Sequence, residues 1–187
     1  GKSNDTTEVY PANSGFPNMI TVAASGPNDE KPSWSNYGKA TVSLASPGLN
    51  IMSTLPSNKY GNLSGTSMAT PLVSGMVAFL LAQDGSLTGA TVKSLLQSTG
   101  AKVSIETACN CRVDAAAAME TLIGKKMFIS PSAITIEPSA TQQFSAVNAN
   151  GSVTFKSSNE AVAAFNSAGL LTAKSEGELT VTGTDSQ

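Results

Sequence analysis

The sequence predicts an α/β region followed by an all-β module. In the first part, short apolar runs bounded by glycine and proline alternate with helical patterns, which is typical of a parallel sheet covered by helices. From Met127 onward, β-branched and aromatic residues form short alternating runs, which favours a small β-sandwich. The change falls at Gly124-Lys125-Lys126. We therefore expect two domains, residues 1–124 and residues 125–187.

Three strands are expected before the main helix of the first domain. Apolar runs bounded by turn residues predict buried strands at residues 19–24, 41–45 and 51–55. The stretch from Tyr60 to Ser64 then leads into a turn of small residues.

Three helices follow these strands. The first is predicted over residues 72–82, with Pro71 in its first turn. Only two residues interrupt its apolar character, so we expect it to be buried on every side. The second helix is predicted over residues 88–98 and the third over residues 114–122, where apolar residues recur at helical spacing.

In the second domain, apolar and polar residues alternate in short runs, as in strands that are buried on one face. Its predicted strands are residues 128–129, 134–136, 143–147, 153–155 and 179–182. Asn150-Gly151 stands between two of these runs and predicts a hairpin turn. Further turns are expected at Pro131, Pro138 and Gly169.

The run Gly65-Thr66-Ser67-Met68-Ala69-Thr70-Pro71 presents a serine directly before the first helix. A serine is an effective nucleophile when a turn exposes its oxygen, a base reaches it and N–H groups surround the developing oxyanion. The first amides of a helix supply such N–H groups, because they have no partner within the helix. The pattern alone is equally consistent with a hydroxyl residue that caps a core helix.

This motif, followed by Val73-Ser74-Gly75, resembles the serine-centred motif of the subtilisin-like serine proteases, the subtilases. Other matching stretches occur in that family's order, at residues 10–12, 17–24, 34–38, 45–48, 51–54, 92–96 and 112–115. The resemblance covers roughly residues 1–124. It implies the second half of a subtilisin-like parallel-sheet catalytic domain. Leu72 replaces the histidine that usually follows the proline, so altered helix packing is expected there.

The resemblance implies roles for three residues. Ser67 is expected to be the catalytic nucleophile of a serine endopeptidase that acts on proteins or peptides, and its own N–H is expected to help hold the oxyanion. Thr66 and Met68 are expected to shape the turn. Val9 occupies the position where subtilases commonly have a small residue at the base of the primary specificity pocket. A β-branched residue there predicts a shallow pocket that prefers small or medium apolar side chains over large aromatic ones.

The chain contains no histidine. In subtilases Asp comes first, His second and Ser last, so the resemblance implies that the other two triad residues lie upstream. The oxyanion asparagine is also expected upstream. We therefore expect this chain to be inactive alone and to be part of a larger precursor. The missing fragment either stays bound after cleavage in an exposed polar loop at residues 1–8 or is absent from a partial sequence.

A second interpretation remains open. A protein can retain the serine turn while it has lost the other catalytic groups. The chain would then be a catalytically inactive subtilase-like scaffold that acts as a surface binding or structural protein. The presence of Asp, His and Asn in the upstream sequence would disfavour this alternative.

The second domain resembles the bacterial immunoglobulin-like (Ig-like) domains of group 2. The stretches 157–163 and 168–174, followed by Glu176-Gly177, match the repeating phrase of that family. Phe155 stands where the family often has tryptophan. Such domains usually act as spacers or adhesion modules. The resemblance therefore implies a structural or binding role without chemistry.

Composition limits the partners. The net charge is −2 and charged residues make up 13% of the chain, which indicates neither nucleic acid nor membrane lipid as a partner. The longest unbroken apolar run, residues 76–82, is too short to span a bilayer, so no transmembrane segment is expected. We expect a secreted, extracellular or cell-surface protein.

Metal and thiol chemistry have little support in the residues. No cofactor is expected in this chain, although the family resemblance implies structural calcium. Asp29-Glu30 is interpreted as a solvated turn and not as a calcium site.

Cys109 and Cys111 are the only cysteines. Cysteines one residue apart rarely bridge to each other, so we expect either a disulfide to the upstream part or a pair of free thiols. Without histidine they form no zinc set.

Overall fold

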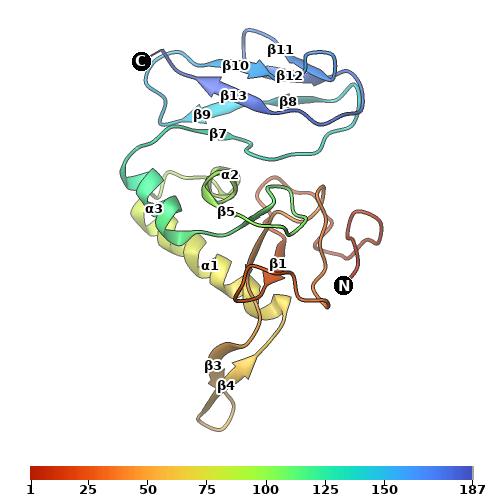
Figure 1. Ribbon diagram of the computed structural model, residues 1–187. Coiled ribbons are helices and arrows are strands. Elements are labelled where there is room, and N and C mark those ends of the chain that lie inside the picture. Colours follow the sequence, from red (N-terminus) through yellow and green to blue (C-terminus); the bar gives the residue numbers. More distant parts are fainter. Residues whose placement is uncertain (187) are drawn as a thin grey trace.

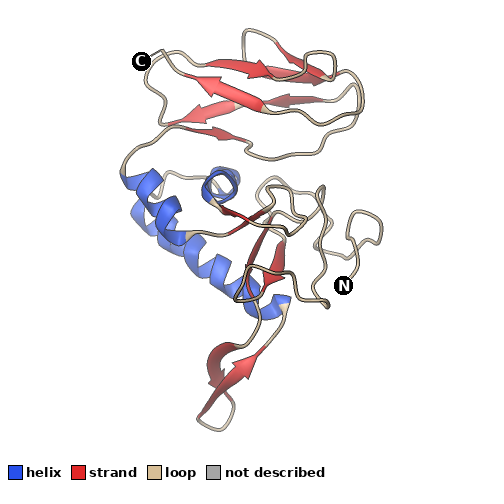
Figure 2. Cartoon of the chain, viewed as in Figure 1, coloured by secondary structure: helices blue, strands red, loops and turns tan. Residues whose placement is uncertain are grey.

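The computed structural model describes residues 1–186; residue 187, the last of the predicted second domain, lies outside this range. In Figure 1 the α/β part lies below the β-rich part, and the chain passes between them directly after the third helix. Figure 2 shows that all the helices belong to the lower part. The predicted fold class, an α/β region followed by an all-β module, is confirmed.

A four-stranded sheet lies at the centre of the α/β part. Its strands, in spatial order, are β1 (Val22–Ser25), β2 (Leu44–Pro47), β6 (Cys111–Arg112) and β5 (Ala101–Lys102). The first three are parallel, and β5 pairs with β6 in the antiparallel direction. The first two strands begin about three residues later than predicted. Just before them, Ser43 donates its N–H to the Thr21 carbonyl, but the Thr21 N–H donates to the Ser43 hydroxyl, so a side chain replaces the regular backbone ladder there. Strands β5 and β6 were not predicted, because a strand of two residues is too short to show an alternating pattern.

The third predicted strand exists but belongs to a separate hairpin. Strand β3 (Ile51–Leu55) pairs with β4 (Lys59–Leu63) in the antiparallel direction, with Ile51 opposite Leu63. Ser57 and Asn58 in the connection both have positive φ, which permits the tight reversal. Figure 1 shows this hairpin projecting away from the rest of the molecule.

The helices are α1 (Thr66–Gln83), α2 (Gly89–Thr99) and α3 (Ala115–Ile123). The predictions for α2 and α3 are confirmed, and both helices have side-chain caps: Thr88 accepts from Thr91 N–H, and Asp114 accepts from Ala117 N–H. The prediction for α1 was wrong at its start. This helix begins six residues earlier than predicted, so Pro71 lies inside it rather than in its first turn.

Most of residues 1–8 are exposed, as the polar sequence predicts, but the segment is attached to the rest of the fold at specific points. Asn4 is only 4% exposed, and Ser3 forms a parallel bridge with Tyr37. The carboxylate of Asp5 accepts hydrogen bonds from the N–H groups of Ala40 and Thr41 and from the Thr41 hydroxyl. These contacts bind the segment to the loop before β2.

The cysteines pair with each other, which corrects the expectation of a bridge to another segment or free thiols. Cys109 and Cys111 form a disulfide, with their Cα atoms 5.1 Å apart. Asn110 between them has a φ of 46°, so the chain turns tightly at this position. Both cysteines are buried in the core beside α2.

Up to residue 186, the upper part contains seven short strands in three antiparallel sheets. These pair β7 (Phe128–Ser130) with β9 (Ser145–Val147), β12 (Leu170–Ala173) with both β8 (Thr141–Gln143) and β11 (Ala163–Phe165), and β10 (Thr154–Ser157) with β13 (Val181–Thr184). Phe144, Phe155 and Phe165 pack together between them, with the rings of Phe144 and Phe165 in a T-shaped pair 5.3 Å apart.

Three predictions for this part were wrong. The run 143–147 is interrupted at Phe144, which turns into the core. Residues 134–136 form no strand. Asn150-Gly151 forms a turn with positive φ at Gly151, but it connects β9 to β10, which pair with different strands. The backbone N–H of Asn150 instead donates to Asp185, which fixes this turn near the end of β13.

One hydrophobic cluster of the α/β part extends across the junction to Phe128, whereas Phe144 belongs to a separate cluster within the upper part. Phe128 is 6% exposed and packs in the same cluster as Leu80 of α1, Leu95 of α2 and Leu122 of α3. Among the described residues, two polar contacts also cross the junction. The hydroxyls of Ser94 and Ser130 lie 2.9 Å apart, and Lys39 pairs with Glu178 at 3.4 Å.

Lys93 of α2 lies at this junction and predicts a pH dependence of stability. Burial lowers the pKa of its ammonium group below the ordinary value of 10.5. The folded chain therefore releases this proton at lower pH than the unfolded chain does. We expect the free energy of unfolding of the wild type, relative to Lys93→Met, to rise as pH increases from neutral towards about 10. Urea denaturation over that range measures the difference, and a constant difference contradicts the prediction.

Candidate active site

The turn before α1 is fixed to the ends of two sheet strands. Gly48 donates its N–H to the carbonyl of Ser25 at the end of β1, and its own carbonyl accepts the N–H of Gly65 at 2.8 Å. Ala69, in the first turn of α1, is fully buried against this contact. The carboxyl ends of β1 and β2 thus hold the turn that presents Ser67.

Gly48 is a positioning residue whose role the sequence does not reveal, since Pro47-Gly48 indicates only a turn. A Cβ at this position would lie 2.7 Å from the Cβ of Ala24 and 2.8 Å from the carbonyl oxygen of Gly65. Only glycine allows the two segments to approach so closely. This close contact holds the serine turn at a fixed place relative to the sheet.

We expect Gly48→Ala to lower the free energy of unfolding by about 1–3 kcal/mol, because the added methyl group overpacks this contact. Gly75→Ala is the matched control. A Cβ at Gly75 meets no atom within 4 Å, and alanine is favoured over glycine inside a helix, so this variant is expected to be neutral or stabilising. Urea denaturation compares the two variants. Equal effects of both substitutions would refute the packing argument.

The N-terminus of α1 offers two unused N–H groups beside the exposed Ser67. The amides of Met68 and Ala69 both donate to the carbonyl of Gly65. Within residues 1–186, the amides of Thr66 and Ser67 have no hydrogen-bond acceptor. No acidic side chain lies in the first turn, so the positive end of the helix dipole is uncompensated there. This arrangement can stabilise a negative charge that develops beside Ser67.

The geometry lacks a base for Ser67. The sequence holds no histidine, and in the part that the structure describes the Ser67 hydroxyl has no hydrogen-bond partner. The nearby hydroxyl of Thr70 is engaged with the carbonyl of Thr66 at 2.9 Å. The chain therefore holds a candidate nucleophile and candidate oxyanion donors, but not the group that would remove the serine proton.

Comparison with known sequences identifies the family of this site. The subtilase family matches residues 1–122, well over half of the chain. The chain belongs to the subtilase family. The bacterial Ig-like domain (group 2) matches residues 125–187. A subtilase-family protease region is therefore followed by an Ig-like module.

Two curated subtilases illustrate the similarity. Thermitase from Thermoactinomyces vulgaris is 43% identical over 104 residues, covering 56% of this chain and 36% of thermitase. Subtilisin E from Bacillus subtilis (strain 168) is 40% identical over 100 residues, covering 53% of this chain and 26% of subtilisin E. A solved structure of proteases from Pseudoalteromonas arctica superimposes with a TM-score of 0.53 at 30% identity, covering 60% of this chain and 38% of that one. The chain matches about a quarter to a third of the length of these curated relatives.

The main helix of this subtilase region is not buried on every side, contrary to the sequence-based expectation. Its buried residues, Ala69, Val73 and Leu80, form one stripe that faces the core. Leu72 is 44% exposed and Phe79 is 63% exposed. The described residues 1–186 thus cover only one face of an apolar helix.

By length and composition α1 is apolar enough to cross a membrane, with a mean hydropathy of 1.3 over 18 residues. Core helices of globular proteins meet the same criterion. The helix begins at the subtilase serine motif and packs Val73 and Leu80 into the core. We therefore treat it as a core helix of the subtilase region.

Val9 lies in the exposed N-terminal segment. Its N–H donates to the side chain of Asn13, and it precedes a cis bond between Tyr10 and Pro11. The Tyr10 hydroxyl donates to Glu8, and this hydrogen bond raises the pKa of Tyr10. Within residues 1–186, no hydrogen bond connects Val9 to the Ser67 turn. Its role in a specificity pocket stays a prediction.

Subtilases commonly bind structural calcium, and no cluster of acidic side chains marks such a site in the part of the chain that the structure describes. No group of three or more acidic, histidine or cysteine side chains gathers within residues 1–186. The Asp29-Glu30 turn is solvent-exposed, as predicted: the Asp29 side chain is 43% exposed, although it also forms an ion pair with Arg112 of β6. Glu30 accepts the N–H of Asn28 in the same turn. We assign no calcium ligand in this chain.

Proposed function

We propose that this chain supplies the nucleophile of a serine endopeptidase, and that Ser67 is that nucleophile. The observation that carries the proposal is the exposed serine at the second position of α1, beside two N–H groups without acceptors. Ser67 Oγ attacks the scissile carbonyl carbon and its proton passes to a histidine. The backbone N–H of Ser67 helps to stabilise the resulting oxyanion, in a turn shaped by Thr66 and Met68.

The histidine, the triad aspartate and the oxyanion asparagine come from an upstream segment of the same precursor in this proposal. The absence of histidine from all 187 residues requires an external base. The exposed apolar face of α1, which includes Leu72 and Phe79, offers a surface for that segment. Burying a large apolar side chain contributes about 1.5–3 kcal/mol, so even these two residues favour association.

The remaining parts of the proposal concern substrate and location. We propose that residues 1–124 act as the protease part and residues 125–187 as an Ig-like spacer or adhesion module of a protein that is secreted or held at the cell surface. Protein or peptide substrates are bound with small or medium apolar side chains before the cleaved bond, because Val9 narrows the pocket. A substrate panel in which cleavage is fastest after Phe or Tyr would refute the role of Val9.

The test compares two forms of the protein. The chain is expressed alone and, separately, together with the upstream segment encoded before it in its own gene. Both forms are analysed by native mass spectrometry and treated with a fluorophosphonate serine probe. We expect the segment to remain bound and Ser67 to be labelled only in the combined form. Labelling at another residue would overturn the assignment of Ser67.

The alternative, an inactive subtilase-like scaffold, makes the opposite prediction. In that case the combined form binds the upstream segment but Ser67 is not labelled. Sequencing the upstream segment then explains the result, because a scaffold lacks the aspartate, histidine or asparagine.

A further inference from the structure

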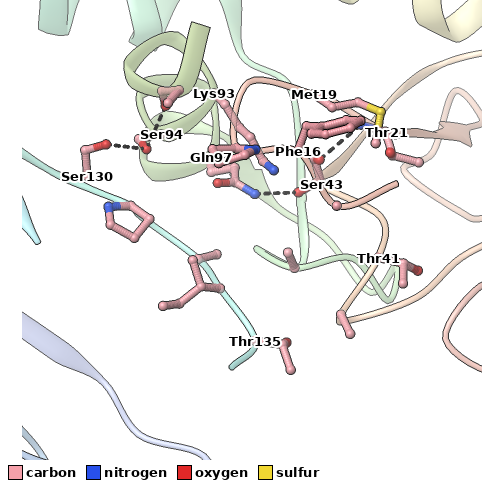
Figure 3. A pocket seen from close by; sticks show the side chains of 18 of the residues that line it. Phe16, Met19, Thr21, Thr41, Ser43, Lys93, Ser94, Gln97, Ser130 and Thr135 are labelled. Atoms are coloured by element: carbon pink, nitrogen blue, oxygen red, sulfur yellow. Dashed lines mark hydrogen bonds between the residues drawn. The ribbon is translucent and has the colours of Figure 1, made fainter. Parts of the chain in front are cut away.

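A cavity of about 530 Å³ lies at the junction between the subtilase region and the Ig-like module. Its lower wall includes Phe16, Ser43 and Lys93, and its upper wall includes Ile134 and Ile136 of the segment after β7. Figure 3 shows Lys93 extending from α2 towards the side on which Phe16 and Ser43 lie, with Thr135 on the opposite wall. Cavities of this size between domains are large enough for a small ligand.

Among the described residues that line this cavity, Lys93 is the only charged one. The groups that face it from α2, from the loops before β1 and β2 and from the Ig-like module are hydroxyls, amides and apolar side chains. Within residues 1–186, its ammonium group has neither an ion-pair partner nor a hydrogen bond. Burial lowers its pKa. A half-buried cation without a counter-charge favours an anionic group from outside.

The upper wall offers a second recognition element. In the described part of the chain, residues 131–136 make no backbone hydrogen bond, although their Ile-Thr-Ile sequence has the alternation of a strand. Their N–H and C=O groups are free to pair with an added strand. The exposed side chains of Ile134 and, on the opposite wall, Phe16 add apolar surface for the side chains of such a strand.

We propose that this cavity binds a short extended peptide that carries a carboxylate. The carboxylate pairs with Lys93, and the peptide backbone adds as a strand to residues 133–136. A small inorganic anion would satisfy the charge but would leave the apolar wall and the unpaired backbone unused. The carboxylate comes either from a peptide C-terminus or from an acidic side chain. The inference does not depend on Ser67 being catalytic.

Fluorescence anisotropy with labelled peptides tests this proposal on a protein of residues 1–187. The probes are the tetrapeptide Leu-Val-Thr-Val as its free acid, the same peptide as its C-terminal amide, and Leu-Val-Asp-Val as an amide. A fourth probe is the free acid with N-methylated backbone amides. We expect the free acid to bind about tenfold more tightly than its amide, since a charge-assisted hydrogen bond is lost in the amide. N-methylation is expected to weaken binding by a similar factor.

Two protein variants locate the site. Lys93→Met keeps the length of the side chain and is expected to remove the preference for the acid over the amide. Lys126→Met removes a lysine that is exposed and does not line the cavity, and it is expected to leave binding unchanged. Thermal unfolding of both variants verifies that they are folded.

Each result bears on the proposal. Tight binding of the aspartate peptide as an amide identifies an acidic side chain as a source of the carboxylate, and weak binding restricts the source to a C-terminus. Equal binding of acid and amide, an unchanged preference in Lys93→Met, or the absence of binding by all probes overturns the carboxylate site. Undiminished binding of the N-methylated acid overturns strand addition.

Discussion

Replacing Ser67 with alanine in the protein assembled with its upstream segment is expected to reduce peptide hydrolysis by a factor on the order of 10⁶. The Ser67 hydroxyl oxygen is the group that attacks the peptide bond and forms the acyl-enzyme that water then hydrolyses, and alanine has no atom to form that bond. The N–H groups of Thr66 and Ser67 remain in the variant, so residual hydrolysis by water assisted by the oxyanion hole is expected. Initial rates on a chromogenic peptide measure the loss.

The control for this substitution is Ser98→Ala. Ser98 is an exposed serine of α2 whose hydroxyl donates to the carbonyl of Leu95, away from the α1 turn. This variant is expected to retain full activity. If Ser67→Ala also retains activity, Ser67 is not the nucleophile. If the unsubstituted assembly is itself inactive, the scaffold interpretation replaces the endopeptidase.

The local features of the serine turn were predictable from the sequence because they depend on neighbouring residues. A run of small residues before an apolar stretch indicates both the turn and the free amides, and α1 confirms their location at a helix start. The predicted start of α1 was wrong because proline is favoured in the first turn of a helix, which placed the start close to Pro71. In the structure the proline occupies the sixth helical position, where the helix continues around it at the loss of one hydrogen bond.

Features that depend on contacts between distant segments were not predictable in the same way. The close approach of Gly48 to Gly65 requires both segments to lie on the sheet, and Pro-Gly alone indicates only a turn. Strand β3 pairs with β4 and not with the parallel sheet, and the pattern of residues 51–55 does not indicate which strand will be its partner. The same holds for Asn150-Gly151, a turn sequence that does not connect paired strands because β9 pairs with β7.

The junction between the domains predicts the largest effect on stability. Phe128 begins the first strand of the Ig-like module, yet it is 6% exposed and packs with core residues of the subtilase region, including Leu95 and Leu122. Removing a buried phenylalanine side chain leaves a cavity among these residues. We expect Phe128→Ala to lower the free energy of unfolding by about 3–5 kcal/mol. Differential scanning calorimetry and urea denaturation measure the loss.

The matched control is Phe79→Ala in the chain without its upstream segment. Phe79 is 63% exposed on α1, so its removal there is expected to change stability by less than about 0.5 kcal/mol. Because Phe128 belongs to one module by sequence and to the other by packing, the wild type is expected to unfold in a single transition. Two separate transitions, or a small effect of Phe128→Ala, would mean that the Ig-like module is a tethered spacer. A single transition lowered by this substitution would make the module part of the folded unit that supports α2.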